Sequence, residues 1–209
     1  MKVQLTDTEL TKLSAVIGEM EESTSGEIRL MIVRRSSVIG HIPELLGLIL
    51  LSITFVGVWF FRHDFVEHWW VWPAMFGVSM ALSLVGARSQ FIQRALSSSH
   101  DLEAQVWTRA EVEFGREIKG RTRSATGVLL FLSLMERRAV VLADQGIAGK
   151  LPPETWDQVV RVILSGPATG RWAEKLEEAI RLCGRLLAEH FPQEPGDTNE
   201  LPNAVIIKD

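Results

Sequence analysis

Two acidic residues stand at the ends of apolar segments, where a carboxylate can face a ligand. Glu27 follows Gly26 and opens the run EIRLMIV, and Asp144 follows the run RAVVLA and precedes Gly146. If the two strand ends meet, Glu27 and Asp144 could bind a hard divalent cation such as calcium, or act as an acid and base pair. The structural alternative is that Glu27 pairs with a surface arginine and Asp144 caps a turn.

Four arginines lie close together in pairs along the chain: Arg121, Arg123, Arg137 and Arg138. Guanidinium groups bind phosphate through paired hydrogen bonds, so Arg121 and Arg137 are candidate ligand-binding residues beside Glu27 and Asp144. Anionic lipid head groups would suit the same side chains, and a solvated surface is the ordinary role of such residues.

Several standard catalytic and metal-binding patterns are missing from the sequence. Cys183 is the one cysteine, the five histidines show no HExxH spacing, and neither a Gly-x-Ser-x-Gly nor a Walker A pattern occurs. A cysteine-based zinc site, a nucleophile elbow and a P-loop are therefore not supported. A net charge of −4 argues against nucleic acid as a partner.

The remaining sequence predicts the elements that would position these residues. Thr6 and Glu9 form a capping box for a first helix, and Glu27–Val33, 127–134 and Arg138–Ala143 are predicted strands. Amphipathic helices are expected near 101–119, after the Pro152-Pro153 pair and over 171–190, and 204–207 could add a short strand. Helices around a few apolar strands predict an α/β fold, a layered sandwich around a small sheet.

Two uncharged runs, 45–61 and 69–87, interrupt this pattern. Each is about as long as the 17 to 25 residues that cross a bilayer, and the short connection predicts an inserted two-helix transmembrane hairpin. Ser79, Ser83 and Ala87 repeat at every fourth position, as do Gly77 and Ala81, which favours close helix packing. The predicted organisation is a first helix and strand in 1–40, the hairpin with its juxtamembrane flank in 41–96, and the rest of the domain in 97–209.

Charge and tryptophan placement predict the orientation of the hairpin. Trp59, Trp69, Trp70 and Trp72 gather at its turn and would mark one membrane interface. Arg34, Arg35, Arg88 and Arg94 flank its outer ends, whereas only Arg62 lies in the turn. Because positive charge is retained in the cytoplasm, we expect a multi-pass inner-membrane protein whose domain and both termini are cytoplasmic.

The order of several segments resembles that of the TPM domain family, in particular its short, membrane-anchored bacterial branch. These segments are STSGEIR at 23–29, Arg121-Thr122, GVLL at 127–130, RRAVVLADQGI at 137–147 and Leu201-Pro202. The resemblance implies an α/β/α sandwich. It also implies acid phosphatase activity, binding of divalent cations such as calcium, or assembly of membrane complexes, each found in some relatives. The sequence at 143–147 departs from the glycine-rich segment of longer relatives.

Two functions follow as expectations. The first is a membrane-tethered binding or complex-assembly module, with the lipid bilayer and a membrane protein complex as partners. The second is a phosphatase-like hydrolase that acts on phosphate esters, with Asp144 or Glu27 in acid, base or metal-holding roles. The absence of a complete catalytic motif favours the module.

Overall fold

The computed structural model describes residues 5–36, 42–60, 70–86, 99–169 and 171–208. The chain divides into two compact units. Met1–Ser36 and Glu103–Asp209 form the first, here called the sheet unit. Ser37–Leu102 forms the second, here called the helix-pair unit.

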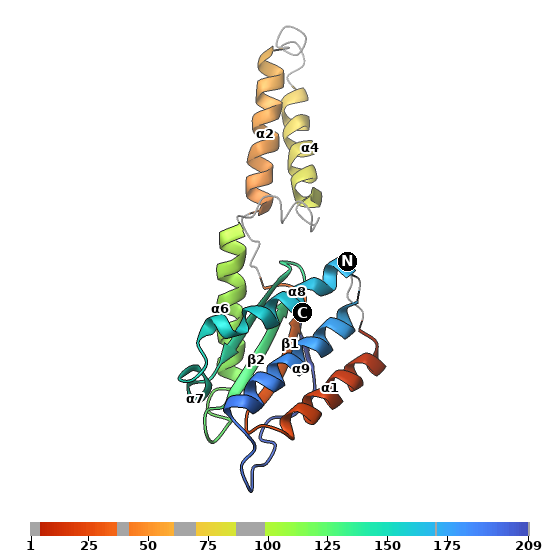
Figure 1. Ribbon diagram of the computed structural model, residues 1–209. Helices are drawn as coiled ribbons and strands as arrows, with labels where there is room; N and C mark the ends of the chain where they lie inside the picture. The colour runs from red at the N-terminus through yellow and green to blue at the C-terminus, as the bar shows by residue number, and fades with distance from the viewer. Residues whose placement is uncertain (1–4, 37–41, 61–69, 87–98, 170, 209) are drawn as a thin grey trace. The chain divides into compact units, whose positions relative to one another are not determined.

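A four-stranded sheet lies at the centre of the sheet unit (Figure 1). Its strand order is β3-β2-β1-β4, with β1 at Glu27–Val33, β2 at Gly127–Ser133, β3 at Arg138–Ala143 and β4 at Ile206–Lys208. β1 is parallel to β2 and β4, and β2 pairs antiparallel with β3. Every residue of β1 and β2 is buried, which explains their continuous aliphatic runs. The strands β1, β2 and β3 confirm the three longer strands predicted from the sequence.

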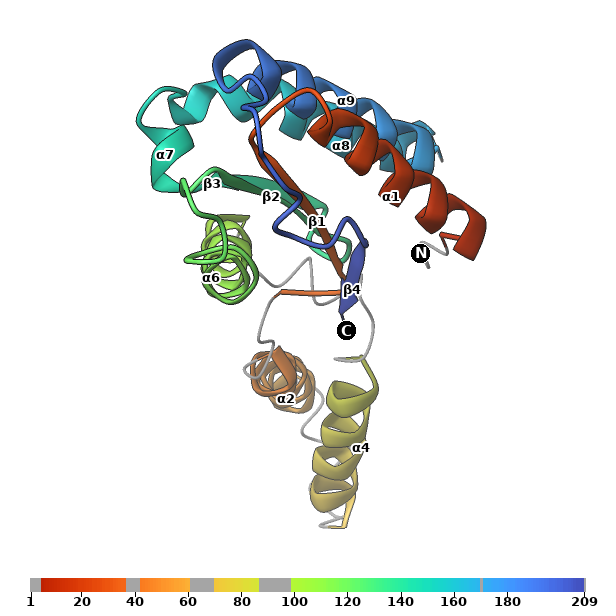
Figure 2. The ribbon, with the colours of Figure 1, turned by 90° about the horizontal axis from the view of Figure 1, so that it is seen from below.

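Helices cover both faces of the sheet, as Figure 2 shows. α1 (Asp7–Glu21), α8 (Asp157–Thr169) and α9 (Trp172–His190) lie on one face, and α6 (Ser99–Glu117) lies on the other. Alternate residues of β1 belong to separate cores: Ile28, Leu30 and Ile32 pack with α1, α8 and α9, whereas Met31 and Val33 pack with α6. The short helix α7 (Gln145–Ala148) and a 3-10 turn, η1 (Pro153–Trp156), connect β3 to α8.

The start of α1 confirms a local prediction. The backbone N–H of Glu9 donates to Thr6 Oγ1 at 3.3 Å, and the N–H of Thr6 donates to Glu9 Oε2 at 2.7 Å. This reciprocal capping box satisfies two backbone groups that the first helical turn leaves without a partner.

The helix-pair unit consists of α2 (Ile42–Phe60) and α4 (Val71–Gly86), which pack against each other. Ser79 and Ser83 are buried, and Ser79 Oγ lies 3.2 Å from Thr54 Oγ1 of α2, so the predicted role of these two small residues is confirmed. Gly77 and Ala81 are exposed, so the second small-residue row is not part of the described contact. Ala87 lies outside the described residues.

The prediction of a transmembrane hairpin is wrong. Among the helices that the structure describes, none is both long enough and apolar enough to span a bilayer. α4 has 16 residues, and the first turn of α2 contains Glu44, so each apolar stretch rises only about 24 Å against a hydrocarbon core of about 30 Å. The predictions of an integral membrane protein and of a multi-pass inner-membrane location with a cytoplasmic domain fail with it. Arg62, Arg88 and Arg94, on which the orientation depended, lie outside the described residues.

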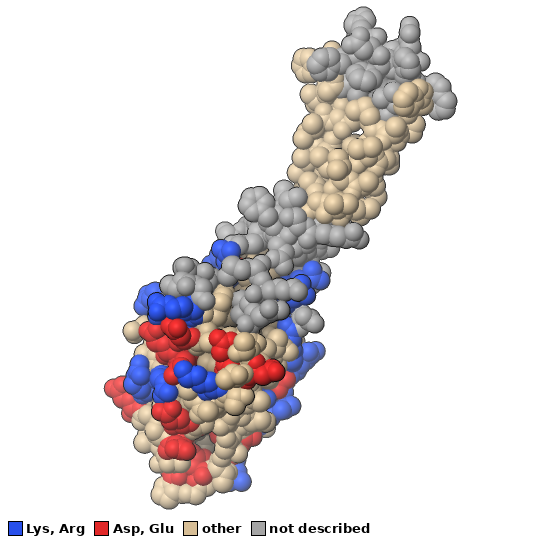
Figure 3. Space-filling model, turned by 90° about the vertical axis from the view of Figure 1, so that its right-hand side faces the viewer, with Lys and Arg blue, Asp and Glu red and all other residues tan. Residues whose placement is uncertain are grey.

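The outer surface of the helix pair is nevertheless apolar. Leu48, Ile53 and Phe55 are each more than 60% exposed. Figure 3 shows the contrast: basic and acidic side chains are interspersed over the visible face of the sheet unit, and the described part of the helix pair shows neither kind.

Candidate functional site

Glu27 lies at the start of β1 and is 6% exposed. Its Oε1 accepts the backbone N–H of Glu200 at 3.0 Å, and its Oε2 accepts that of Leu201 at 3.2 Å. Burial raises the pKa of Glu27, although the two backbone N–H groups act in the opposite direction. The carboxylate therefore binds the segment that precedes β4 to the start of β1. The predicted alternative, an ion pair with a surface arginine, is not seen among the described residues.

Asp144 is the N-cap of α7. Its Oδ1 accepts the N–H of Gln145 at 2.8 Å, and its own N–H donates to the carbonyl of Gly127 at 2.9 Å. This agrees with the structural alternative expected for Asp144. Gly127 also stands opposite Glu27 in the sheet, so the two carboxylates do reach the same end of the sheet.

The structure gives no support to the predicted metal site at Glu27 and Asp144. No group of three or more His, Cys, Asp or Glu side chains placed to hold a metal ion occurs in the part of the chain that the structure describes. The intervening strand β2 separates the backbones of Glu27 and Asp144 by roughly 9–10 Å. Each of the two carboxylates is held by backbone N–H groups of its own: Glu27 by those of Glu200 and Leu201, and Asp144 by that of Gln145.

The four arginines of the sequence cluster lie at opposite ends of β2. Arg121 and Arg123 precede this strand and Arg137 and Arg138 follow it, a separation of roughly 20 Å. Arg123 Nε lies 3.3 Å from Glu200 Oε1, and Arg138 Nη1 lies 3.7 Å from Glu103 Oε2. Arg137 occupies the turn between β2 and β3 with a φ of 53°. Arg121 and Arg137 therefore cannot hold one phosphate together.

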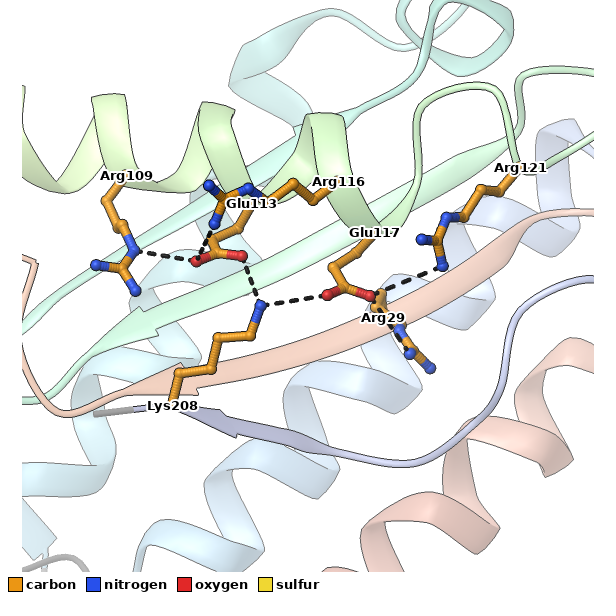
Figure 4. A network of polar contacts seen from close by, with 7 residues as sticks. All are labelled: Arg29, Arg109, Glu113, Arg116, Glu117, Arg121 and Lys208. Carbon is orange, nitrogen blue, oxygen red and sulfur yellow. Dashed lines mark hydrogen bonds and ion pairs between the residues drawn. The ribbon is translucent and has the colours of Figure 1, made fainter.

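A different set of charges gathers between α6 and the β1–β4 edge of the sheet (Figure 4). It is called here the α6 charge cluster. Glu113 Oε2 accepts a hydrogen bond from Lys208 Nζ at 2.7 Å, and Glu117 Oε1 lies 3.2 Å from the same nitrogen. Five basic and two acidic side chains make the cluster positive by three charges; they are Arg29, Arg109, Glu113, Arg116, Glu117, Arg121 and Lys208.

Glu113 is the fully buried member of this cluster. Burial alone would raise the pKa of its carboxyl, but the hydrogen bond from Lys208 and the nearby Arg109, whose Nε lies 3.1 Å away, lower it below the ordinary value. Glu113 therefore stays ionised and its charge is compensated by two cations.

Arg29 is buried, but the N–H groups of its side chain are incompletely hydrogen-bonded. The residue is 7% exposed, and its Nη2 lies 3.8 Å from Glu117 Oε2, too far for a hydrogen bond. Its Nε and Nη1 have no hydrogen-bond partner among the described residues. Desolvation lowers the pKa of Arg29, yet a guanidinium stays charged in proteins. Three N–H groups of a buried cation thus lack an acceptor.

Glu21 adds a protonated carboxyl near Arg29. Its Oε1 accepts the N–H of Ile28 at 2.8 Å, at the part of the β1 edge that β4 leaves open, since β4 pairs only from Met31 onward. Burial raises the pKa of Glu21 to about 8, and Glu27 and Arg29 both act on it electrostatically. At neutral pH the carboxyl of Glu21 is therefore mainly protonated, which makes it a potential hydrogen-bond donor.

The sequence contained a signal for Arg29 that motif searches miss. Within EIRLMIV, a strand buried at every position, Arg29 is the one basic residue. A charged residue is rarely placed in such a strand unless it is paired or bound. Glu117 and Lys208 carry no comparable signal, because they come from a helix and a strand that meet only in the fold.

Comparisons with known proteins show the fold and not the function. No family model matches the chain, and no curated protein does. The NMR structure of the BA42 protein from the psychrophilic bacterium Bizionia argentinensis is similar, with a TM-score of 0.62 and 20% sequence identity, over 99% of this chain and 98% of that one. At this identity the similarity shows a shared fold alone.

Proposed function

We propose that the sheet unit is a binding module that holds an anionic group of its ligand, a phosphate or a carboxylate, against Arg29 and Arg121. The observation that carries this proposal is the incomplete hydrogen bonding of the buried Arg29. A buried donor without an acceptor costs about 1–3 kcal/mol, and more when it is charged, so an oxyanion that accepts its N–H groups would bind favourably.

The surroundings of Arg29 favour an anion over a neutral ligand. Glu117, the one ion-pair partner of Arg29 among the described residues, also lies 4.0 Å from Arg121 and 3.2 Å from Lys208. Glu117 therefore contacts three cations, one of which, Lys208, is also bound by Glu113. Arg121 is about half exposed and gives a ligand access from the solvent side.

A binding role also accords with the sequence, which lacks a complete catalytic motif. The resemblance to the TPM domain family remains a prediction. Of the functions that it implies, this proposal follows binding and complex assembly. Cation binding and membrane attachment form no part of it.

The test measures the melting temperature of the full chain with inorganic phosphate or acetate, against chloride at equal ionic strength. At a concentration near a hundred times Kd, binding adds about 2.7 kcal/mol, which corresponds to roughly 5–10 °C for a chain of this length. Arg29→Lys, which keeps the charge but loses the planar donor set, should remove most of the shift, and Arg121→Ala should reduce it. Arg185→Ala, an exposed arginine on α9, is the matched control. A shift that survives Arg29→Lys would contradict the proposal.

A phosphatase-like hydrolase is the second candidate, and the protonated Glu21 favours it. A carboxyl with a pKa of about 8 beside a buried arginine could give its proton to the leaving oxygen of a phosphate ester while water attacks the phosphorus. Hydrolysis of a generic phosphomonoester by the full chain, abolished by Glu21→Gln and retained by the exposed-site control Glu189→Gln, would support it. Binding of phosphate without turnover would leave the binding module as the function.

A further inference from the structure

The outer edge of β3 carries backbone groups that no other described strand pairs with. β3 is the last strand of the sheet on its side. The N–H of Asp144 donates to Gly127, which fixes the ladder: Arg138, Val140 and Leu142 bond inward to β2. The N–H and C=O groups of Ala139, Val141 and Ala143 consequently point outward.

A groove of about 390 Å³ runs along this edge. β3 forms one side of it, Val106 and Trp107 of α6 line one wall, and Trp156 and Val160 line the other. Trp107 is 46% exposed, so a large apolar surface stands beside the outward backbone groups. An edge strand between two apolar walls is the arrangement in which an added strand gains both backbone hydrogen bonds and side-chain burial.

The charge of the groove selects among possible occupants. Glu103, Glu154, Asp157 and Arg138 line it, and Arg138 is engaged with Glu103 at 3.7 Å. Two exposed carboxylates, Glu154 and Asp157, lie on the wall formed by η1 and α8. They are placed to contact a chain bound in the groove. This wall is complementary to lysine or arginine.

We propose that the β3 edge is a docking site for an extended segment of a partner protein that carries basic side chains, which pairs with Ala139, Val141 and Ala143 as a fifth strand. An extended chain presents a backbone donor and acceptor toward one side at every second residue, about 6.8 Å apart, which matches the outward groups of β3. A helix satisfies its own backbone groups and would leave those of β3 unpaired. This docking site is separate from the Arg29 site and does not depend on it.

Amide hydrogen exchange of the full chain, measured by NMR, tests the pairing directly. The probe is a peptide of about eight residues that alternates lysine and valine, with a glutamate–valine peptide of equal length as control. We expect the amides of Ala139, Val141 and Ala143 to exchange about tenfold more slowly with the basic peptide. Those of Arg138, Val140 and Leu142 are already bonded to β2 and should change little. Protection that spares the outward amides would overturn the proposal.

Two variants of the protein test the backbone pairing and the wall charge separately. Ala139→Pro removes an outward donor without removing a β2–β3 hydrogen bond, at a less buried position where an edge strand tolerates proline, and it should weaken binding of the basic peptide. Glu154→Lys with Asp157→Lys reverses the wall charge and should weaken binding, measured by fluorescence anisotropy, by about tenfold or more. Glu189→Lys on α9 is the control for added charge. Equal affinity of the charge-reversed and control proteins would refute the proposal, as would a β3 edge that is protected only by concentration-dependent pairing with a second copy.

Discussion

Glu21, the last residue of α1, closes the open part of the β1 edge by accepting the backbone N–H of Ile28 at 2.8 Å. This contact joins the last residue of the helix to a strand residue seven positions further along the chain. It also places a carboxyl in a buried site, where burial raises its pKa to about 8. The contact therefore couples folding stability to pH.

Stability should fall as the pH rises between about 4.5 and 8. In this window the native Glu21 holds a proton that the unfolded chain has lost, so the free energy of unfolding declines by up to about 1.4 kcal/mol per pH unit. Glu21→Gln keeps the acceptor for Ile28 but does not titrate. Denaturant unfolding of both proteins at several pH values should show this slope in their difference. Glu22→Gln, at an exposed neighbour, should not change the slope, and a constant difference for Glu21→Gln would contradict the raised pKa.

Local features of the fold were predictable from sequence because neighbouring residues determine them. The capping box of Thr6 and Glu9, and the strand Glu27–Val33, depend on spacing and on continuous apolar character. The transmembrane prediction relied on the lengths of two uncharged runs in the sequence. It was wrong because none of the described helices is both long and apolar enough; α4, for example, has 16 residues at Val71–Gly86. Apolar runs of this length do not distinguish a spanning helix from a shorter one.

The candidate site was hard to predict because its members come from four separate parts of the chain. Arg121 and Arg137 are close in sequence, yet β2 places them at its opposite ends. Arg29 and Lys208 are distant in sequence, yet Glu117 of α6 contacts both. Proximity in sequence predicts contact within a helix or a turn, and it fails across a seven-residue strand.

Gly146 should not tolerate a side chain. Its N–H donates to Ala125 at 3.0 Å, and an added Cβ would lie 2.5 Å from the carbonyl oxygen of Ser124 and 2.7 Å from that of Ala125. Gly146→Ala should destabilise the protein by about 1–3 kcal/mol in chemical unfolding, because the clash is with backbone. Gly115→Ala, in an open position on α6, is the matched control and should stabilise by about 1 kcal/mol. Similar effects of the two substitutions would show that the close approach at Gly146 is wrong.

Arg137 should be replaceable by glycine at no cost. Its φ of 53° is in the left-handed region, which a glycine adopts without the steric penalty of a side chain. Arg137→Gly should leave stability unchanged or raise it by up to about 1 kcal/mol, whereas Arg137→Val should lower it. Phosphate binding should be unaffected, because β2 separates Arg137 from Arg29. Loss of phosphate binding in Arg137→Gly would restore Arg137 as a ligand residue.

The ion pair of the buried Glu113 and the partly exposed Lys208 should hold β4 in the sheet. Lys208 ends a strand that pairs with β1 over only three residues, and its Nζ lies 2.7 Å from Glu113 Oε2. Glu113→Leu removes the carboxylate that Lys208 and Arg109 contact, although both cations keep solvent access and Lys208 keeps Glu117, so the free energy of unfolding should fall by about 1–3 kcal/mol. Exchange of the Ile206 and Ile207 amides should accelerate at the same time, because β4 loses its anchor.

A double-mutant cycle separates this pair from the rest of the cluster. If Glu113 and Lys208 stabilise each other, Glu113→Leu combined with Lys208→Met should cost less than the sum of the single changes, because neither charge is then left without its partner. The pH dependence provides a second check. The pKa of Glu113 is lowered in the folded protein, so its stabilising contribution is present above the unfolded pKa and is lost as the pH falls through the folded pKa. This sign is opposite to that of Glu21. Additive single changes, together with an unchanged acid limb of the stability profile in Glu113→Leu, would mean that β4 is held by its backbone pairing with β1 alone.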